Sequence, residues 1–284
     1  MGDILRDIIK MIGLISLICF SFFYTETIMD VVNEQDEIMI KINEEKDKYK
    51  KEPTNAIITK DTITPGLNGY EVDVEKSYKD MKQVGIFKEM LLSYKQIKVE
   101  NSLSNIYDKY IVKGNNIKKN VALIFTIKNK NDLNQILSIK DVYLNIFIDY
   151  KLLADNLNDL KKDNYFIYTY GDNSNYTTDN LVYANNLINN NFNNKSLYCL
   201  TDKKNKNTLN TCKNKKMHTI YPTIITNNHA YNNIKNNITN GSLILLEPNT
   251  KTLNEFSQII NFIVSKGYKI VSLDQILSEI YWKK

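Results

Sequence analysis

From Asn120 onward, short apolar segments alternate with helix-length amphipathic segments. The apolar segments are VALIFTI, VYLNIFI, YFIYTY, SLYCL, TIYPTIIT, SLILLE and YKIVSL. Between them lie NDLNQILSI, KLLADNLNDLKK, DNLVYANNLINNNF, LNEFSQIINFIVSKG and LDQILSEIYW. Continuous apolar strands with intervening helices are typical of a parallel sheet that is buried on both faces. This pattern predicts an α/β fold, a closed or nearly closed barrel, with any functional site in the loops after the strand carboxyl ends.

The N-terminal segment predicts a membrane anchor over residues 11–32, after a cytoplasmic stretch over residues 1–10. No charged residue occurs from Met11 to Tyr24, and extension through Val32 gives a helix long enough to cross a membrane. So short an uncharged run also suits a signal-peptide core, but no small-x-small cleavage site follows it. A buried core helix is the remaining alternative. Positive charges precede the run, which predicts a single-pass protein with its C-terminal domain outside the cytoplasm.

Residues 33–53 predict a helical stalk. Positions spaced alternately by four and three form a heptad seam, typical of a short coiled coil, at Ile28, Val32, Gln35, Met39, Ile42, Lys46 and Tyr49. A single amphipathic helix lying on the membrane or on the next domain fits the pattern equally well. Pro53 ends the helix, because its ring cannot continue the hydrogen-bond ladder. Residues 54–118 then predict a small leading region with a helix from about Val74 to Gln83, and residues 119–284 the main domain.

The charge distribution disfavours nucleic-acid binding. The net charge is +5, and the lysines are spread along the chain without a dense basic cluster. Nucleic-acid-binding proteins normally carry a focused basic patch. We therefore expect no nucleic-acid partner.

The C-terminal stretch GSLILLEPNTKTLNEFSQIINFIVSKGYKIVSLDQIL resembles the last strand and helix of polysaccharide deacetylases of the NodB-homology family. VALIFTI resembles the first strand of that family and VYLNIFI the second, and the similarity covers about residues 118–282 in order. The resemblance implies a distorted β/α barrel. It also implies an enzyme that removes acetyl groups from glycans with a divalent metal such as zinc. In the family an aspartate and two histidines hold the metal, a second aspartate is the base and a further histidine the acid.

The sequence departs from the family at each of these positions. Thr126 stands where the family has the general base, Ile127 where it has the metal-binding aspartate, and Glu247 where it has the histidine of the last strand. The stretch YGDNSNYTTDN, after the third strand, contains no histidine. Loss of metal ligand, base and acid together leaves little catalysis. The substitutions predict a bacterial pseudoenzyme without a catalytic metal or other cofactor.

A relocated metal site is the alternative. The chain has only two histidines, His218 and His229, and their spacing matches no short zinc motif. A carboxylate cluster near the strand ends would suit a hard cation, formed by Asp149, Asp172, Asp202 and Glu247.

Other residues near the strand ends are candidates for ligand binding, namely Lys128, Asp172, Tyr176 and Glu247. Tyr170 and Tyr176 would stack on sugar rings. Cys199 and Cys212 are spaced so that a disulfide can close a short loop in an oxidising compartment, and two buried thiols are the alternative.

Three functional hypotheses follow. The first is a membrane-anchored protein outside the cytoplasm that lacks deacetylase activity and binds cell-wall glycan or an envelope protein. The second is a metal-dependent carbohydrate deacetylase with a relocated site. The third is a structural envelope scaffold that self-associates through the stalk.

Overall fold

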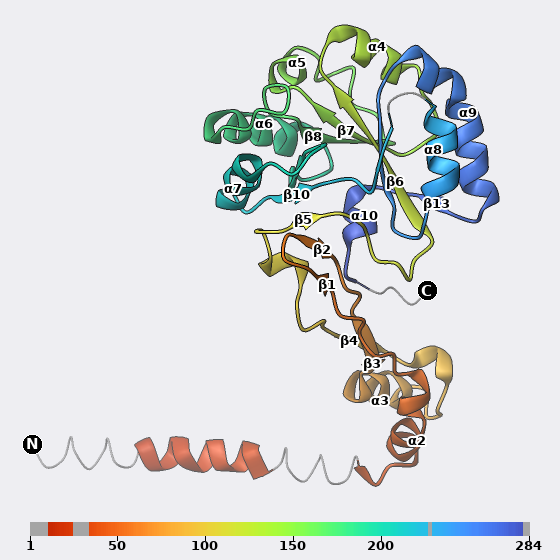
Figure 1. Ribbon diagram of the computed structural model, residues 1–284. Coiled ribbons are helices and arrows are strands. Elements are labelled where there is room, and N and C mark those ends of the chain that lie inside the picture. Colours follow the sequence, from red (N-terminus) through yellow and green to blue (C-terminus); the bar gives the residue numbers. More distant parts are fainter. Residues whose placement is uncertain (1–10, 25–33, 227–228, 281–284) are drawn as a thin grey trace, which may run out of the picture. The chain divides into compact units, whose positions relative to one another are not determined.

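The computed structural model describes residues 11–24, 34–226 and 229–280, and the chain divides into two compact units (Figure 1). The smaller unit includes residues up to 52 together with residues 69–97. The larger unit combines residues 53–68 with residues 98–284. The chain therefore enters the larger unit, leaves it for the smaller one, and returns.

The main sheet of the larger unit is entirely parallel. Its strand order is β11-β12-β6-β7-β8, and β13 also pairs with β6. The bounds are β6 (Asn120–Ile127), β7 (Leu144–Ile148), β8 (Tyr165–Thr169), β11 (Ile224–Ile225), β12 (Leu243–Leu246) and β13 (Lys269–Ile270). Parallel pairing places the carboxyl ends of β6, β7, β8 and β12 along one edge of the sheet, which we call the carboxyl edge.

A second sheet has the order β1-β2-β5-β10-β9, in which only the β1–β2 pair is antiparallel. The strands are β1 (Ile57–Ile58), β2 (Thr62–Thr64), β5 (Tyr110–Ile111), β9 (Tyr198–Leu200) and β10 (His218–Ile220). Residues 53–68 thus contribute two strands to the fold of the main domain, although the sequence predicted them as part of a separate leading region.

The two sheets do not close into one barrel, so the expectation of a closed barrel is wrong. Side chains take the place of a strand ladder between β8 and β9. The Asn194 side chain accepts a hydrogen bond from the Ile167 amide at 3.0 Å and donates one to the Ile167 carbonyl at 2.7 Å. An amide side chain can satisfy one strand residue in this way, but it cannot propagate a ladder. The parallel α/β architecture with covering helices agrees with the prediction.

Alternate residues of β6 face two different cores, which explains its uninterrupted apolar sequence. Val121, Leu123 and Phe125 join a core formed with the covering helices, whereas Ala122 and Ile124 face the interior between the sheets. Around the interior, the rings of Phe147 and Tyr168 stack at 5.1 Å between centroids, and Tyr198 meets Tyr168 edge-on at 5.4 Å. The helices are α4 (Lys130–Leu137), α5 (Tyr150–Asp155), α6 (Thr178–Asn191), α7 (Lys206–Asn214), α8 (Ala230–Asn237), α9 (Thr250–Ser265) and α10 (Leu273–Leu277).

Several of these helices begin at a polar side chain that accepts a hydrogen bond from a first-turn amide. Such capping satisfies donors that have no partner within the helix. The capping residues are Asn129 for α4, Asp149 for α5, Thr177 for α6, Asn205 for α7, Asn249 for α9 and Ser272 for α10. Asn129, Asn205 and Asn249 therefore have a structural role as helix caps.

The smaller unit packs two helices beside an antiparallel strand pair. It contains α2 (Glu37–Glu45), the 3₁₀ turn Lys46–Tyr49, β3 (Gly69–Val72), α3 (Val74–Lys82), the 3₁₀ turn Glu89–Leu91 and β4 (Tyr94–Ile97). Ile38 and Ile42 of α2 share a core with Tyr78 and Met81 of α3. The described part of the predicted stalk therefore lies on its own unit. Residues 28 and 32 of the heptad seam lie outside the described residues, and self-association stays a prediction.

The prediction of a single-pass membrane protein is contradicted. The uncharged run is helical over the described residues 11–24. Among the residues that the structure describes, no helix is both long and apolar enough to cross a membrane. Residues 1–10 and 25–33, over which the predicted anchor and its cytoplasmic flank would extend, lie outside that description.

Candidate functional site

Thr126 and Ile127, at the end of β6, occupy the positions of the two family aspartates. Thr126 has the same parity as Ala122 and Ile124, so it faces the interior, and its exposed fraction is 5%. Ile127 is fully buried in the core beneath the covering helices. The aliphatic side chain of Ile127 offers no lone pair to a cation, and its burial leaves no space for one. Ile127, at the metal-binding position, therefore does not fit the metal that the family resemblance implies.

Two of the carboxylates near the strand ends, Asp149 and Asp172, are engaged in other contacts. Asp149, after β7, accepts hydrogen bonds from the amides of Lys151 at 2.9 Å, Leu152 at 3.2 Å and Asn173 at 3.1 Å. Asp172 forms an ion pair with Lys151 at 3.2 Å. In the described part of the chain, no group of three or more histidine, cysteine, aspartate or glutamate side chains is placed to hold a metal ion. The predicted carboxylate cluster is therefore not formed.

The two histidines do not share a site. His218 begins β10, at the opposite edge of its sheet from the strand carboxyl ends, and stacks on Tyr107 with 4.4 Å between ring centroids. Burial lowers its pKa to about 4. His229 is exposed and adopts a left-handed backbone conformation immediately before α8. Neither histidine replaces the pair that the family has after its third strand.

Lys128 and Glu247 remain exposed at the carboxyl edge. The Lys128 ammonium lies 6.0 Å from the centroid of the Tyr170 ring, so it reaches from the end of β6 toward the end of β8. The Glu247 carboxylate accepts a hydrogen bond from the Asn249 side chain at 3.4 Å. Tyr170 itself is buried, and burial together with the nearby Asp202 carboxylate raises its pKa. Lys128 and Glu247 are thus free to contact a ligand, whereas Tyr170 is not placed to stack on a sugar.

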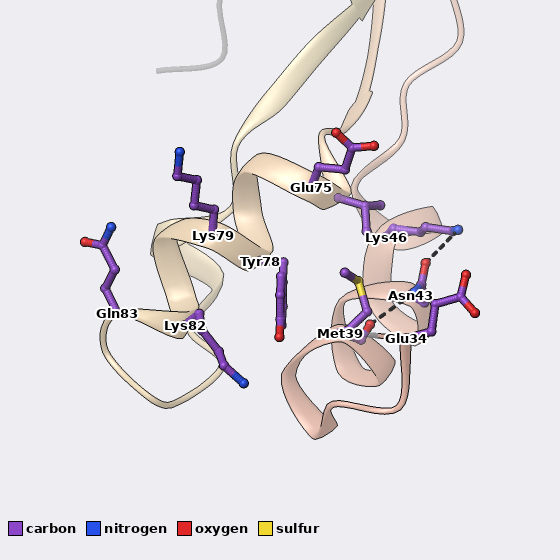
Figure 2. Close-up of a pocket in the computed structure, with 10 residues that line it drawn as sticks. Glu34, Met39, Asn43, Lys46, Glu75, Tyr78, Lys79, Lys82 and Gln83 are labelled. Carbon is purple, nitrogen blue, oxygen red and sulfur yellow. Dashed lines mark hydrogen bonds between the residues drawn. The ribbon is translucent and has the colours of Figure 1, made fainter. Parts of the chain in front are cut away.

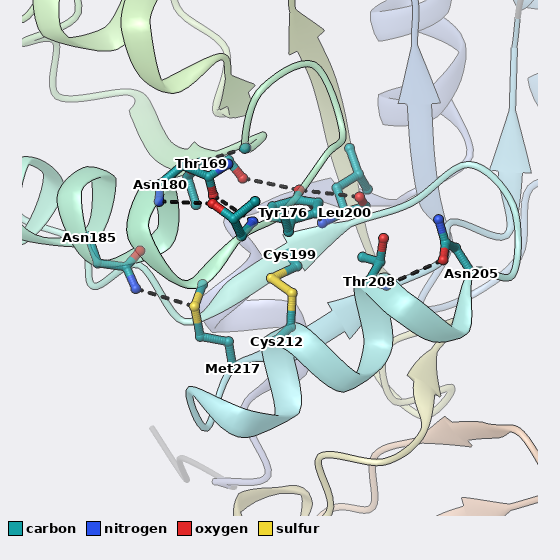
Figure 3. Close-up of a disulfide and its surroundings, with 12 residues drawn as sticks. Thr169, Tyr176, Asn180, Asn185, Cys199, Leu200, Asn205, Thr208, Cys212 and Met217 are labelled. Atoms are coloured by element: carbon teal, nitrogen blue, oxygen red, sulfur yellow. Dashed lines mark hydrogen bonds between the residues drawn. A yellow bond between two sulfur atoms is a disulfide. The ribbon is translucent and has the colours of Figure 1, made fainter.

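Tyr176 is a structural residue, which corrects its prediction as a ligand contact. Its exposed fraction is 6%, so its ring offers no free face to a sugar. The hydroxyl accepts a hydrogen bond from the Leu200 amide at 2.9 Å, and its proton faces the carbonyls of Leu200 and Thr169 at 3.2 and 3.3 Å (Figure 3). Tyr176 therefore links the ends of β8 and β9 across the gap between the two sheets.

The predicted disulfide between Cys199 and Cys212 is present and joins β9 to α7 (Figure 3). Both cysteines are fully buried. They share a small core with Tyr176, Leu181 and Met217. The disulfide and the Tyr176 hydroxyl stabilise the same corner of the larger unit.

Two of the cavities in the described structure bear on ligand binding, and neither was predicted from the sequence. The larger lies between α2 and α3 and has a volume of about 1010 Å³ (Figure 2). It is lined by Met39, Val74 and Tyr78 and rimmed by charged side chains. The smaller, which we call the edge cavity, has a volume of about 280 Å³ and lies between the start of α5 and the loop that leads into α6. Tyr183, in the second turn of α6, is a residue whose type could have suggested a contact there.

The arrangement at the carboxyl edge can hold a polar ligand, because exposed ammonium, carboxylate and amide groups surround it. The described residues provide no constellation for activating a water molecule through a metal.

Comparison with known proteins agrees with this geometry. No protein-family model matches the chain. The uncharacterized protein YlxY of Bacillus subtilis is 27% identical over 274 residues, which cover 88% of this chain and 86% of that protein. The crystal structure of wild-type BA3943 from Bacillus anthracis, described as a CE4 family pseudoenzyme, is similar with a TM-score of 0.63 and 24% identity, covering 87% of this chain and 96% of that one.

A mutant of BA3943, described as having restored enzymatic activity, matches equally well, with a TM-score of 0.63 and 24% identity over 86% of this chain and 99% of that one. The resemblance to polysaccharide deacetylases that the sequence predicts is thereby confirmed at the level of the fold. The chain has the fold of the family 4 carbohydrate esterases, the NodB-type deacetylases, in a divergent form without the catalytic residues of that family.

Proposed function

We propose that this protein is a catalytically inactive relative of the carbohydrate deacetylases that binds glycan without a metal ion. The observation that carries the proposal is the end of β6. Thr126 replaces the general base, and the side chain at the metal-binding position, Ile127, is fully buried among apolar residues. Both the general base and the metal-binding carboxylate are missing, and Ile127 fills the metal-binding position. Adding metal therefore cannot restore the reaction.

Retention of glycan binding is supported by the exposed polar groups at the carboxyl edge and by the BA3943 comparison. That protein is called a pseudoenzyme, and a mutant of it has restored activity. A mutant with restored activity binds its substrate, which supports the idea that the fold can keep a glycan site when catalysis is lost. We infer that this chain has kept such a site, with cell-wall glycan as the ligand.

Two measurements on the full chain test the proposal. The first is acetate release from N-acetylglucosamine oligomers in the presence of added zinc, manganese or cobalt, for which we expect no turnover above a protein-free control. The second is calorimetric titration with partially deacetylated oligomers in excess chelator, for which we expect binding. Metal-dependent acetate release would overturn the loss of catalysis. Absence of binding to every oligomer would overturn glycan recognition.

A further inference from the structure

The edge cavity is built on a rigid frame. The Tyr150 amide donates to the Gly171 carbonyl at 3.0 Å, and the Asp149 carboxylate accepts from the Asn173 amide at 3.1 Å. Within the loop before α6, Asp172 and Asn175 exchange two backbone hydrogen bonds of 2.9 and 3.0 Å. The start of α5 and this loop are therefore fixed to each other. A preformed cavity binds a ligand with a smaller ordering cost than a mobile one.

Two tyrosine rings form one wall of the edge cavity. Tyr150 of α5 and Tyr183 of α6 meet edge to face, with 6.1 Å between centroids and 87° between ring planes. Figure 1 shows α5 and α6 as neighbours in the larger unit. Tyr183 is 49% exposed, so it contributes little to the core. The Lys151 ammonium lies 5.4 Å from the Tyr150 ring centroid, which shows that this wall accommodates a cation.

The polar lining is acidic rather than basic. Among the described side chains that line the edge cavity, Asp172 and Asp179 carry the formal charges, and amide and hydroxyl groups complete the wall. The first-turn amides of α6 do not favour an anion here, because the Thr177 hydroxyl and the Asn180 side chain form a capping box. Asp172 forms an ion pair with Lys151, whereas Asp179 lies in the first turn of α6. The cavity therefore favours a ligand that brings a positive charge.

We propose that the edge cavity binds an amino sugar with a free amine, as found in de-N-acetylated glycan. The ammonium group would contact Asp179 and the face of Tyr183, while the sugar hydroxyls would contact the amides of the loop before α6. This inference rests on the proposed function and narrows it, because it names the sugar and the position. The protein would then recognise the product that active members of the fold release, rather than their substrate.

The test is calorimetric titration of the full chain, at mildly acidic pH and in chelator, with a glucosamine tetramer and with an N-acetylglucosamine tetramer. We expect the glucosamine tetramer to bind more tightly. Replacing Tyr183 by Ala should weaken its binding by about tenfold, since a cation over an aromatic ring contributes about 0.5–2 kcal/mol. Asp179→Asn should weaken it by about threefold, as expected for a partly exposed charge pair.

Matched controls are Tyr143→Ala and Asp163→Asn. Tyr143 is a half-exposed tyrosine that precedes β7, and Asp163 is an exposed aspartate that precedes β8, so both lie at the amino ends of strands. Neither variant should change binding. Tighter binding of the acetylated tetramer, or unchanged glucosamine binding in Tyr183→Ala, would overturn the amino-sugar site and leave glycan recognition standing. If neither tetramer bound, both proposals would be overturned.

Discussion

The end of β6 and the ends of β8 and β9 face the same carboxyl edge but are built in opposite ways. At the end of β6, a buried isoleucine and a threonine stand where the fold places aspartates in its active members. Between β8 and β9, the Tyr176 hydroxyl and the Asn194 side chain join the two sheets, and a disulfide links β9 to α7. The comparison shows that polar side chains are present where they connect β8 to β9. A polar side chain is absent from the metal-binding position at the end of β6.

The strongest way to break this comparison is to return an acid to the end of β6. Ile127→Asp should destabilise the fold by more than about 4 kcal/mol, because it places a carboxylate without a partner in a sealed core. Chemical denaturation followed by circular dichroism measures the loss. The matched change Glu247→Gln, at an exposed position, should stay within about 0.5 kcal/mol. A stable Ile127→Asp protein that binds zinc would show that the metal site survives.

The disulfide should have the next largest effect. Reduction should lower the free energy of unfolding by about 3 kcal/mol, the value that loop-closure entropy gives for a short loop. Urea denaturation with and without a reductant that reaches the buried bond measures the difference. Cys19→Ser serves as the control, because Cys19 is exposed and unpaired. Equal stability of the reduced and oxidised proteins would mean that the β9–α7 corner is held without the covalent bond.

His218 extends the comparison to the opposite edge of the fold. Its pKa is lowered by burial to about 4, whereas the unfolded value is about 6.5. Between these two pH values the unfolded state therefore binds more protons than the folded state. The contribution of His218 to the free energy of unfolding is fully present above pH 6.5 and decreases as the pH falls toward 4. We expect a loss of about 2 kcal/mol between pH 7 and pH 5 from this group.

The variant His218→Phe keeps a ring beside Tyr107 and removes the titrating group. Its free energy of unfolding should depend less on pH over the same range. Asp274 contributes with the opposite sign, because burial raises its pKa and its protonation favours the folded state. The difference between wild type and variant isolates His218. An unchanged pH profile in His218→Phe would contradict the assignment of a neutral, buried histidine.

Tyr176→Phe is the smallest of the expected effects. It removes a hydroxyl that accepts a hydrogen bond from the Leu200 amide. The buried amide is then left without a partner, which should lower the free energy of unfolding by about 1–2 kcal/mol. Thermal denaturation measures it against Tyr183→Phe, whose exposed hydroxyl should be dispensable. Equal melting temperatures for Tyr176→Phe and wild type would show that the link between β8 and β9 depends on other contacts.

The sequence predicts the parallel strands and covering helices because their apolar patterns are local and continuous. VALIFTI and SLILLE correspond closely to β6 and β12. It does not predict that residues 53–68 join the main domain, because the partner of β2 lies in β5, more than forty residues further along the chain. Between β8 and β9, hydrogen bonds from the Asn194 and Tyr176 side chains replace a strand ladder. The spacing of apolar residues in a strand does not predict such side-chain contacts.

For the site, residue identity at the family positions predicts the absence of catalytic groups, and the spacing of Cys199 and Cys212 predicts the disulfide. The role of Tyr176 was predicted wrongly, because a tyrosine in a loop gives no sign of whether its ring points inward. The edge cavity depends on two helices that meet at Tyr150 and Tyr183, which are far apart in the sequence.

The most direct test of the central claim is calorimetric titration of the full chain with glucosamine oligomers, run once in excess chelator and once with added zinc. The account predicts the same affinity in both titrations, with no acetate released from acetylated oligomers in either condition. Binding that appears only with zinc, or acetate release that depends on it, would show that a metal site operates in this fold and would contradict the account.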